Sequence, residues 1–241
     1  FKDVTDEVAC FGVFGPRSRN LMSKLSNDDF SNENFKFGTS KTIKISNKKV
    51  WVQRLSYVGE LGFELYVKMN ESKEIYSLLI NKGKEFNLSH CGMFAMDTMR
   101  MEKGYLHWGH DISPEENQYE AGLSFAISYK KNVDFIGKEA LLKIKNHKIK
   151  KKLIMMSLKD NKPGFPLLLH DEPVFLNGKI VGRTTSGNYS FNFNKNIVFG
   201  YVSTDQKMDR GDLEIEVEKT KYKAVIEEKP LHDPDNIIIK N

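Results

Sequence analysis

Cysteine is scarce in this chain of 241 residues, which contains only Cys10 and Cys91. The two lie far apart and form no CxxC pair, so the sequence excludes a disulfide framework and a cysteine-based zinc site, and it indicates a reducing compartment. No apolar stretch approaches the roughly 20 residues that span a bilayer, and no signal peptide is recognisable. These absences predict a protein of a reducing compartment such as the cytoplasm, without a membrane partner.

A large excess of one charge is also missing. The chain has 37 basic and 32 acidic residues, which gives a formal net charge of +5. The lysines are scattered, and the densest group, Lys148 with Lys150, Lys151 and Lys152, is more typical of a solvated helix end or a linker than of a nucleic-acid site. We therefore expect no nucleic-acid partner.

Motifs for several catalytic chemistries are absent as well. There is no GxGxxG dinucleotide fingerprint, no P-loop and no HExxH, and neither a serine nor a cysteine lies in a nucleophile-elbow motif. Of the six histidines only His107 and His110 are close together, and no cysteine or third histidine joins them. The residues alone therefore indicate neither a metal centre nor nucleophilic catalysis.

The sequence does contain the patterning of a globular protein, with 39% hydrophobic and 29% charged residues. In the first part of the chain, strand-like alternation and helix-like spacing are interleaved, which predicts an α+β layer structure. The expected strands cover residues 8–14, 42–45, 50–57 and 63–67, and the expected helices follow Pro16, begin near Glu71 and run over 94–103.

From Lys152 onward the pattern changes to short alternating runs separated by clusters of Gly, Pro, Asn and Asp. Regular short strands of this kind predict a small all-β barrel or sandwich. We therefore expect two domains, residues 1–148 and 149–241, with the boundary in the lysine-rich stretch. The chain begins at Phe1 without a methionine and enters patterned sequence almost at once. We expect from this that an N-terminal portion of the first domain is missing.

The most informative stretch surrounds Gly59-Glu60-Leu61-Gly62. If Glu60-Leu61 formed a hairpin turn, Tyr57 and Glu64 would be directly opposed, with about 4.5–5.5 Å between their Cβ atoms. Glu-Leu is poor chemistry for a tight turn, so a looser loop with the same two residues as neighbours is expected. Two interpretations stay open. The residues form a surface pair, or Glu64 accepts two hydrogen bonds from a planar N–H/NH₂ edge while Tyr57 packs on a heteroaromatic ring.

Residues 55–64 resemble the folate-site signature of the aminomethyltransferase superfamily, which includes the glycine-cleavage T-protein and the folate-binding halves of dimethylglycine and sarcosine dehydrogenases. Further similar blocks keep the family's order: 13–17, 95–105, 107–112, 120–123, 134–141 and 182–187. The resemblance covers almost the whole chain, and the 102–105 and 107–111 blocks favour the dehydrogenase branch. It implies antiparallel sheets with packed helices, followed by a small C-terminal all-β barrel.

The resemblance also implies a ligand, tetrahydrofolate, and a set of residues that contact it. Glu64 would hold the amino-pyrimidine edge of the pterin ring, and the aromatic residues would form an apolar slot. The implied folate-binding residues are Tyr57, Glu64, Arg100, Tyr105 and Trp108.

Simpler interpretations stand beside these assignments. Arg100 lies three residues after Asp97, so the two can form an ion pair within one helix. Phe63 and Trp108 can be ordinary core residues. Met96 occupies the place where the T-protein generally has an arginine, which puts that folate contact in doubt and makes Met96 a helix packing residue.

In the dehydrogenase branch a flavin domain oxidises an N-methyl amine, and the folate half captures the one-carbon unit as 5,10-methylene-tetrahydrofolate. The aspartate that assists the transfer lies upstream of the 13–17 block in the family. The resemblance therefore places the expected catalytic aspartate upstream of this chain and identifies no catalytic residue within it. It also places FAD on a missing N-terminal domain of the same polypeptide. Two alternatives stay open: an aminomethyltransferase that works with a lipoyl carrier protein, and a non-catalytic folate-binding module.

Overall fold

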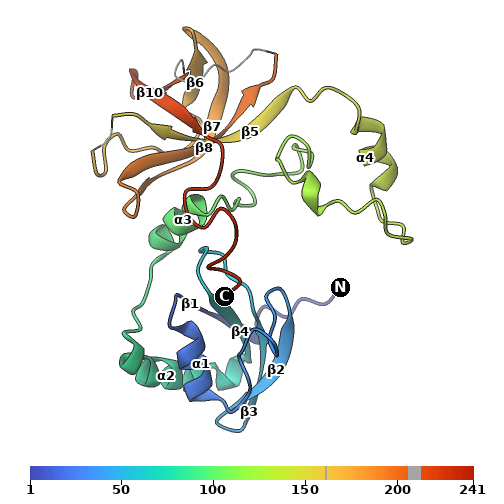
Figure 1. Ribbon diagram of the computed structural model, residues 1–241, viewed down its shortest axis with the longest axis vertical. Helices are drawn as coiled ribbons and strands as arrows, with labels where there is room; N and C mark the ends of the chain where they lie inside the picture. The colour runs from blue at the N-terminus through green and yellow to red at the C-terminus, as the bar shows by residue number, and fades with distance from the viewer. Residues whose placement is uncertain (161, 206–212) are drawn as a thin grey trace. The chain divides into compact units, whose positions relative to one another are not determined.

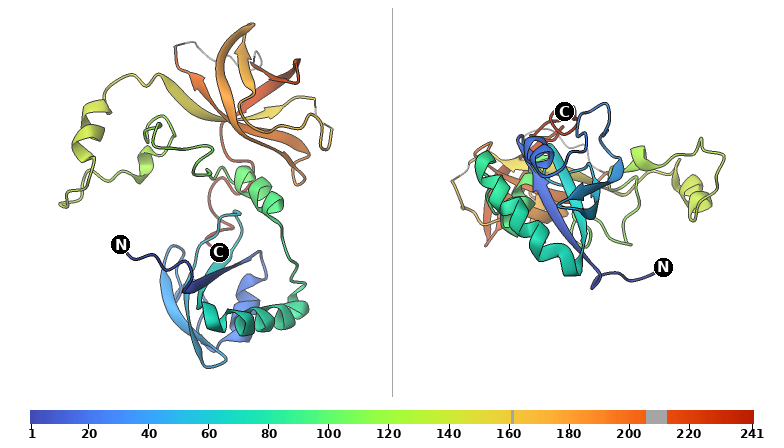
Figure 2. Two further views of the ribbon diagram at one scale, coloured as in Figure 1. Left: turned by 180° about the vertical axis from the view of Figure 1, so that it is seen from behind. Right: turned by 90° about the horizontal axis from the view of Figure 1, so that it is seen from below.

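The computed structural model describes residues 1–160, 162–205 and 213–241. The chain divides into two compact units (Figures 1 and 2). The first unit combines Phe1–Lys103 with the last residues, His232–Asn241, and the second unit is Gly104–Leu231. Each unit has a hydrophobic core of its own. The chain thus leaves the first unit once and returns to it at His232.

A four-stranded antiparallel sheet forms the centre of the first unit. Its strands are β1 (Val8–Phe14), β2 (Ser40–Ile45), β3 (Lys48–Gln53) and β4 (Gly62–Lys68), in the order β1-β4-β3-β2. Side chains alternate between faces along a strand. Accordingly, Phe63, Leu65 and Val67 are buried in the core, whereas Glu64 and Tyr66 are half-buried on the opposite face. That opposite face is called the outer face below.

Helices α1 (Ser18–Leu25) and α2 (Met69–Gly83) bury their apolar stripes in the same core. A 3₁₀ turn, η1 (Lys84–Phe86), extends α2, and α3 (Met93–Glu102) follows. The helices expected after Pro16, near Glu71 and over residues 94–103 are confirmed, with ends that differ by a few positions. In the described part of the chain, no helix combines the length and the apolar character that crossing a bilayer needs.

The second unit begins with loops that contain two short helices within its described residues, η2 (Ser124–Ala126) and α4 (Lys138–Ile144). A closed antiparallel barrel follows, with the strand order β10-β5-β8-β7-β6-β9. Its strands are β5 (Lys151–Leu158), β6 (Pro173–Leu176), β7 (Lys179–Ser190), β8 (Lys195–Ser203), β9 (Leu213–Val217) and β10 (Thr220–Glu227). The predicted all-β barrel, and with it the α+β fold followed by a barrel, is confirmed.

Two details differ from the expectations. The strand expected over residues 50–57 ends at Gln53, because the chain then enters a loop that turns at Gly59 with a φ of +78°. Strand β6 was not expected, because its four residues begin with a proline and are too few to show alternation. The domain boundary between residues 148 and 149 stays a prediction, and the barrel strands begin close to it, at Lys151.

Candidate functional site

Glu64 lies near the start of β4, on the outer face of the sheet. Its strand neighbours are Gly12 of β1 on one side and Gln53 of β3 on the other. The hydroxyl of Tyr66 donates a 2.7 Å hydrogen bond to Glu64 Oε2. The Trp51 ring packs on the Tyr66 ring, with 4.8 Å between the ring centroids, and Trp51 is 44% exposed. The two rings are tilted by 44° to each other, so the outer face presents a carboxylate beside a pair of aromatic rings in contact.

The Glu64 carboxylate and burial together raise the pKa of two neighbouring groups. The hydrogen bond to Glu64, together with burial and the negative charge, raises the pKa of Tyr66 well above its ordinary value. Burial, and then the charge of Glu64, raise the pKa of the Cys10 thiol, whose residue pairs with Tyr66 across the sheet. A neutral phenol and a neutral thiol thus surround one negative charge. Within the described residues, Glu64 Oε1 has no hydrogen-bond partner from the protein, so it is available to a ligand.

Tyr57 lies in the loop of residues 54–61, which joins β3 to β4, and its side chain is half-buried. The expected opposition of Tyr57 and Glu64 across a hairpin is wrong, because Gln53 is the residue of β3 that faces Glu64. The looser loop is confirmed, with its left-handed turn at Gly59. The role of Tyr57 as a ligand contact stays a prediction.

Arg100 is 1% exposed on α3, and its Nε donates a 2.7 Å hydrogen bond to Asp97 Oδ1. The predicted ion pair within one helix is therefore present. A support role for Arg100 at a ligand pocket stays a prediction. Met96 lines an apolar cavity of about 370 Å³ together with Met99, β1 and α2, and its expected role in helix packing stays a prediction.

Two of the predicted folate residues belong to the second unit, Tyr105 and Trp108. Trp108 is 66% exposed, so its alternative assignment as a core residue is wrong. For Phe63 the core assignment is confirmed, since its side chain is fully buried and its ring meets that of Phe30 edge to face at 5.6 Å. The remaining three predicted residues, Tyr57, Glu64 and Arg100, lie in the first unit. Ligand contacts by Tyr105 and Trp108 stay predictions.

Asp111, in the 107–112 block, is a structural anchor of the second unit. Its side chain is fully buried and accepts hydrogen bonds from the His107 N–H at 2.9 Å and from Thr185 Oγ1 at 2.6 Å. The Tyr201 hydroxyl donates to the Asp111 carbonyl oxygen at 3.0 Å. Because Thr185 lies on β7 and Tyr201 on β8, these bonds tie the loop to the barrel.

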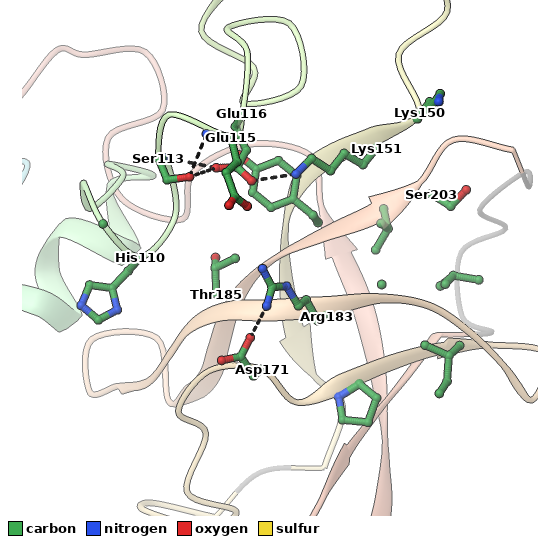
Figure 3. A pocket seen from close by; sticks show the side chains of 17 residues that line it. His110, Ser113, Glu115, Glu116, Lys150, Lys151, Asp171, Arg183, Thr185 and Ser203 are labelled. Atoms are coloured by element: carbon green, nitrogen blue, oxygen red, sulfur yellow. Dashed lines mark hydrogen bonds and ion pairs between the residues drawn. The ribbon is translucent and has the colours of Figure 1, made fainter.

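A hollow of about 600 Å³ lies in the second unit, between the 109–116 loop and strands of the barrel. Figure 3 shows the side chains that line it. Two ion pairs line it, Lys151 with Glu116 at 2.7 Å and Arg183 with Asp171 at 2.8 Å. Each of these cations already has a carboxylate partner. In the described residues, no group of three or more His, Cys, Asp or Glu side chains is arranged as metal ligands, in this hollow or elsewhere.

Sequence reasoning did not find Tyr66 and Trp51. A signal for Tyr66 was present, because strand alternation places the residue two positions after Glu64 on the same face. For Trp51 the signal depends on knowing the β3–β4 register, which pairs it with Tyr66. The aromatic residues beside Glu64 are therefore identified by the strand pairing of the sheet, and the sequence signature alone does not identify them.

Two family models match the chain. The GCVT N-terminal domain matches residues 1–131, and the glycine cleavage T-protein C-terminal barrel domain matches residues 151–233. The first match alone covers more than half of the chain. The chain therefore belongs to the GCVT, or aminomethyltransferase, family, and it carries an aminomethyltransferase-type domain followed by the family's barrel.

Several curated relatives are similar over nearly the whole chain. Human mitochondrial dimethylglycine dehydrogenase is 38% identical over 95% of this chain and 26% of its own length. The formaldehyde-forming 4-methylaminobutanoate oxidase of Paenarthrobacter nicotinovorans is 36% identical over 96% of this chain and 28% of its own length. The aminomethyltransferase of Symbiobacterium thermophilum is 33% identical over 95% of this chain and 60% of its own length. The chain thus spans about a quarter of the first relative's length, and these three relatives are enzymes.

A solved structure has the same fold. The glycine cleavage system aminomethyltransferase T from Bartonella henselae superimposes with a TM-score of 0.80 at 19% sequence identity. The match covers 94% of this chain and 60% of that chain. At this level of identity the likeness concerns the fold alone.

Proposed function

We propose that this chain is the tetrahydrofolate-binding part of a one-carbon enzyme. The enzyme captures the methyl-derived one-carbon unit of an N-methylated amine, of the dimethylglycine or sarcosine type, as 5,10-methylene-tetrahydrofolate. The observation that supports this most is the half-buried Glu64 carboxylate with an available Oε1, beside the rings of Tyr66 and Trp51. The names of the human dehydrogenase and of the formaldehyde-forming oxidase support the same reaction class.

The residues at the outer face fit a pterin ring. A pterin presents a planar N–H/NH₂ edge, and a carboxylate accepts two parallel hydrogen bonds from such an edge. Glu64 can do so while it holds the Tyr66 hydroxyl, because its two oxygens offer about four acceptor positions. The aromatic rings of Tyr66, Trp51 and Tyr57 offer faces for ring packing. A hydrogen-bond acceptor and ring surfaces are therefore both present.

In this proposal the chain binds and orients, and it excludes water. When bound, tetrahydrofolate supplies two nitrogens, N5 and N10, that take up the one-carbon unit. Glu64 fixes the pterin edge, Tyr66 fixes Glu64, and the aromatic side chains keep water from the ring, so that proximity raises the rate. We assign no catalytic residue to this chain. We propose that FAD is held by a separate flavin domain of the same polypeptide, in the mitochondrial matrix if the source is eukaryotic.

A titration of the native full-length polypeptide with tetrahydrofolate tests the site. Glu64→Gln removes the charge of the acceptor, so we expect tetrahydrofolate binding to weaken by about 1.5–3 kcal/mol. Glu33→Gln, which neutralises an exposed acid elsewhere in the first unit, is the matched control and should leave the affinity unchanged. An unchanged affinity in Glu64→Gln would remove the central assignment.

A second candidate function is that of an aminomethyltransferase without a flavin. It is favoured by the aminomethyltransferase relative, of which the chain covers a larger share than of the dehydrogenases. The mass and visible absorption spectrum of the full-length polypeptide separate the two. A long chain with flavin absorption supports the dehydrogenase or oxidase, and a short, colourless chain supports the aminomethyltransferase. Folate binding without turnover of any methylated amine would instead indicate a non-catalytic module.

A further inference from the structure

The last ten residues of the chain return to the first unit beside the loop that carries the folate signature. In Figures 1 and 2 this dark red tail, residues 232–241, runs past α3 toward the start of β4. The Arg54 guanidinium, 1% exposed at the beginning of the loop, donates to the carbonyl oxygens of Lys240 at 2.8 Å and Asn241 at 2.9 Å. One end of the tail is thus bonded to one end of the loop.

The other end of the tail contacts the turn of the loop. His232 Nε2 lies 3.0 Å from Glu60 Oε1, and the His232 N–H donates to the Glu102 carbonyl oxygen at 2.9 Å. Gly59, which has a φ of +78°, is so close that a Cβ atom at this position would lie 2.9 Å from the His232 ring and 3.0 Å from Lys103. The turn is therefore packed directly between the tail and the end of α3.

Asp233 gives the tail a fixed shape. Its carboxylate accepts hydrogen bonds from the N–H groups of Ile237, Ile238 and Ile239 at 2.7, 3.0 and 3.2 Å. It also forms a 3.0 Å ion pair with Lys103, in which the two side chains are only 2% and 3% exposed. The tail is thus folded around one buried carboxylate and anchored to the residue that follows α3.

We propose that residues 232–241 are a clasp that holds loop 54–61 in its ligand-binding conformation, and that His232 is a positioning residue for Tyr57 of this loop. Residues 55–61 of the loop belong to no strand, so their conformation depends on contacts of this kind. The positioning role rests on the proposed function of the site, whereas the holding of the loop does not. If the loop is already ordered in the free protein, ligand binding does not have to supply the free energy of ordering it, and the affinity is higher.

The test uses the full-length polypeptide with His232→Ala and a matched control, His147→Ala, which removes an exposed histidine of the second unit. Two quantities are measured well below the unfolding temperature: hydrogen exchange of the amides of residues 56–61, and the Kd for tetrahydrofolate. We expect His232→Ala to speed exchange in the loop while exchange in β5 and β8 is unchanged. We expect its Kd to rise about three- to tenfold, and His147→Ala to change neither quantity.

A second variant tests the contact itself. Glu60→Ala should reproduce both effects, and the double variant His232→Ala/Glu60→Ala should be no worse than either single one, because the same contact is lost in each. Unchanged loop exchange in His232→Ala would overturn the clasp, and faster exchange with an unchanged Kd would overturn the positioning role. If the wild type binds no tetrahydrofolate, the proposed function fails and the positioning role fails with it, while the exchange data alone decide whether the tail holds the loop.

Discussion

The two units contain ion pairs of nearly the same length in very different surroundings. In the first unit, Lys103 and Asp233 are 3.0 Å apart and almost completely buried. In the second, Arg183 and Asp171 are 2.8 Å apart, with side chains 65% and 58% exposed. Water screens an exposed pair, whereas the loss of one partner of a buried pair leaves an uncompensated charge in the interior. Burial, and not distance, therefore decides which pair determines the structure.

The largest effect is expected from Asp233→Ala. This variant removes the carboxylate from the buried Lys103 ammonium, which keeps only its hydrogen bond to the Asp233 carbonyl oxygen among the bonds to Asp233, and it removes the acceptor of three backbone N–H groups. We therefore expect the first unit to lose about 3–5 kcal/mol of unfolding free energy. Trp51 and Trp108 are the two tryptophans of the chain. Urea unfolding followed by Trp51 fluorescence in a Trp108→Phe background therefore reports on the first unit. A loss as small as that of Asp171→Ala, the exposed counterpart, would break the comparison.

The same carboxylate predicts a dependence of stability on acid. Burial alone would raise the pKa of Asp233, but the N–H donors of Ile237, Ile238 and Ile239 and the Lys103 ammonium lower it to about 2, from an ordinary value of 3.8. Because the pKa is lower in the folded state, the carboxylate stabilises the fold at pH values above its unfolded-state pKa. This contribution is lost as the pH falls toward 2. We expect a loss of about 2 kcal/mol over this range.

Urea unfolding followed by Trp51 fluorescence between about pH 5 and pH 2 measures this loss. Asp233→Asn serves as the reference, because it has no carboxyl group to titrate at this position. Its stability should depend less on pH than that of the wild type. Equal slopes for the two proteins would show that the carboxylate is not held in its charged form by the first unit.

A smaller effect is expected at the outer face, where Glu64 has a hydrogen-bond donor but, within the described residues, no cation within ion-pair distance. Tyr66→Phe removes the donor and keeps the carboxylate, so tetrahydrofolate binding should weaken by about 1 kcal/mol. Isothermal titration gives the value, with Tyr222→Phe in the barrel as the control. A loss larger than that of Glu64→Gln would mean that Tyr66 contacts the ligand itself.

The smallest effect is expected from Arg183→Ala. Because the Arg183–Asp171 pair is exposed, its removal should change the stability of the second unit by less than about 1 kcal/mol. Trp108 fluorescence in a Trp51→Phe background follows this unit, and added salt should shrink the difference further. A loss of several kcal/mol would show that this surface pair acts like the buried one.

Local patterns predicted much of the fold. The alternation of Phe63, Leu65 and Val67 with Glu64 placed β4 and its two faces correctly, because burial on one face leaves a period of two in the sequence. The spacing of Ile75 and Leu79 predicted α2 for the corresponding helical reason. The short strands of the barrel, with the exception of β6, followed from their length and from the turn residues between them.

The contacts around the candidate site were less predictable, because they join positions far apart in the chain. Lys103 and Asp233 are separated by 130 positions, and the local sequence around either residue does not indicate that the other is its ion-pair partner. The opposition of Tyr57 and Glu64 failed for a similar reason, since the register that pairs Gln53 with Glu64 is decided by the whole sheet and not by the residues of the turn. The signature located the site, and tertiary packing determined its geometry.

The return of residues 232–241 also constrains the order in which the protein can fold. The second unit is continuous in sequence, so all of it leaves the ribosome before Asp233 and Ile239 appear. Domains generally fold as units during synthesis, starting from the N-terminal end. Here we expect the reverse order of completion. The barrel can close while the first unit still lacks the residues that bury Lys103 and bind Arg54, and the unit that begins the chain is finished last.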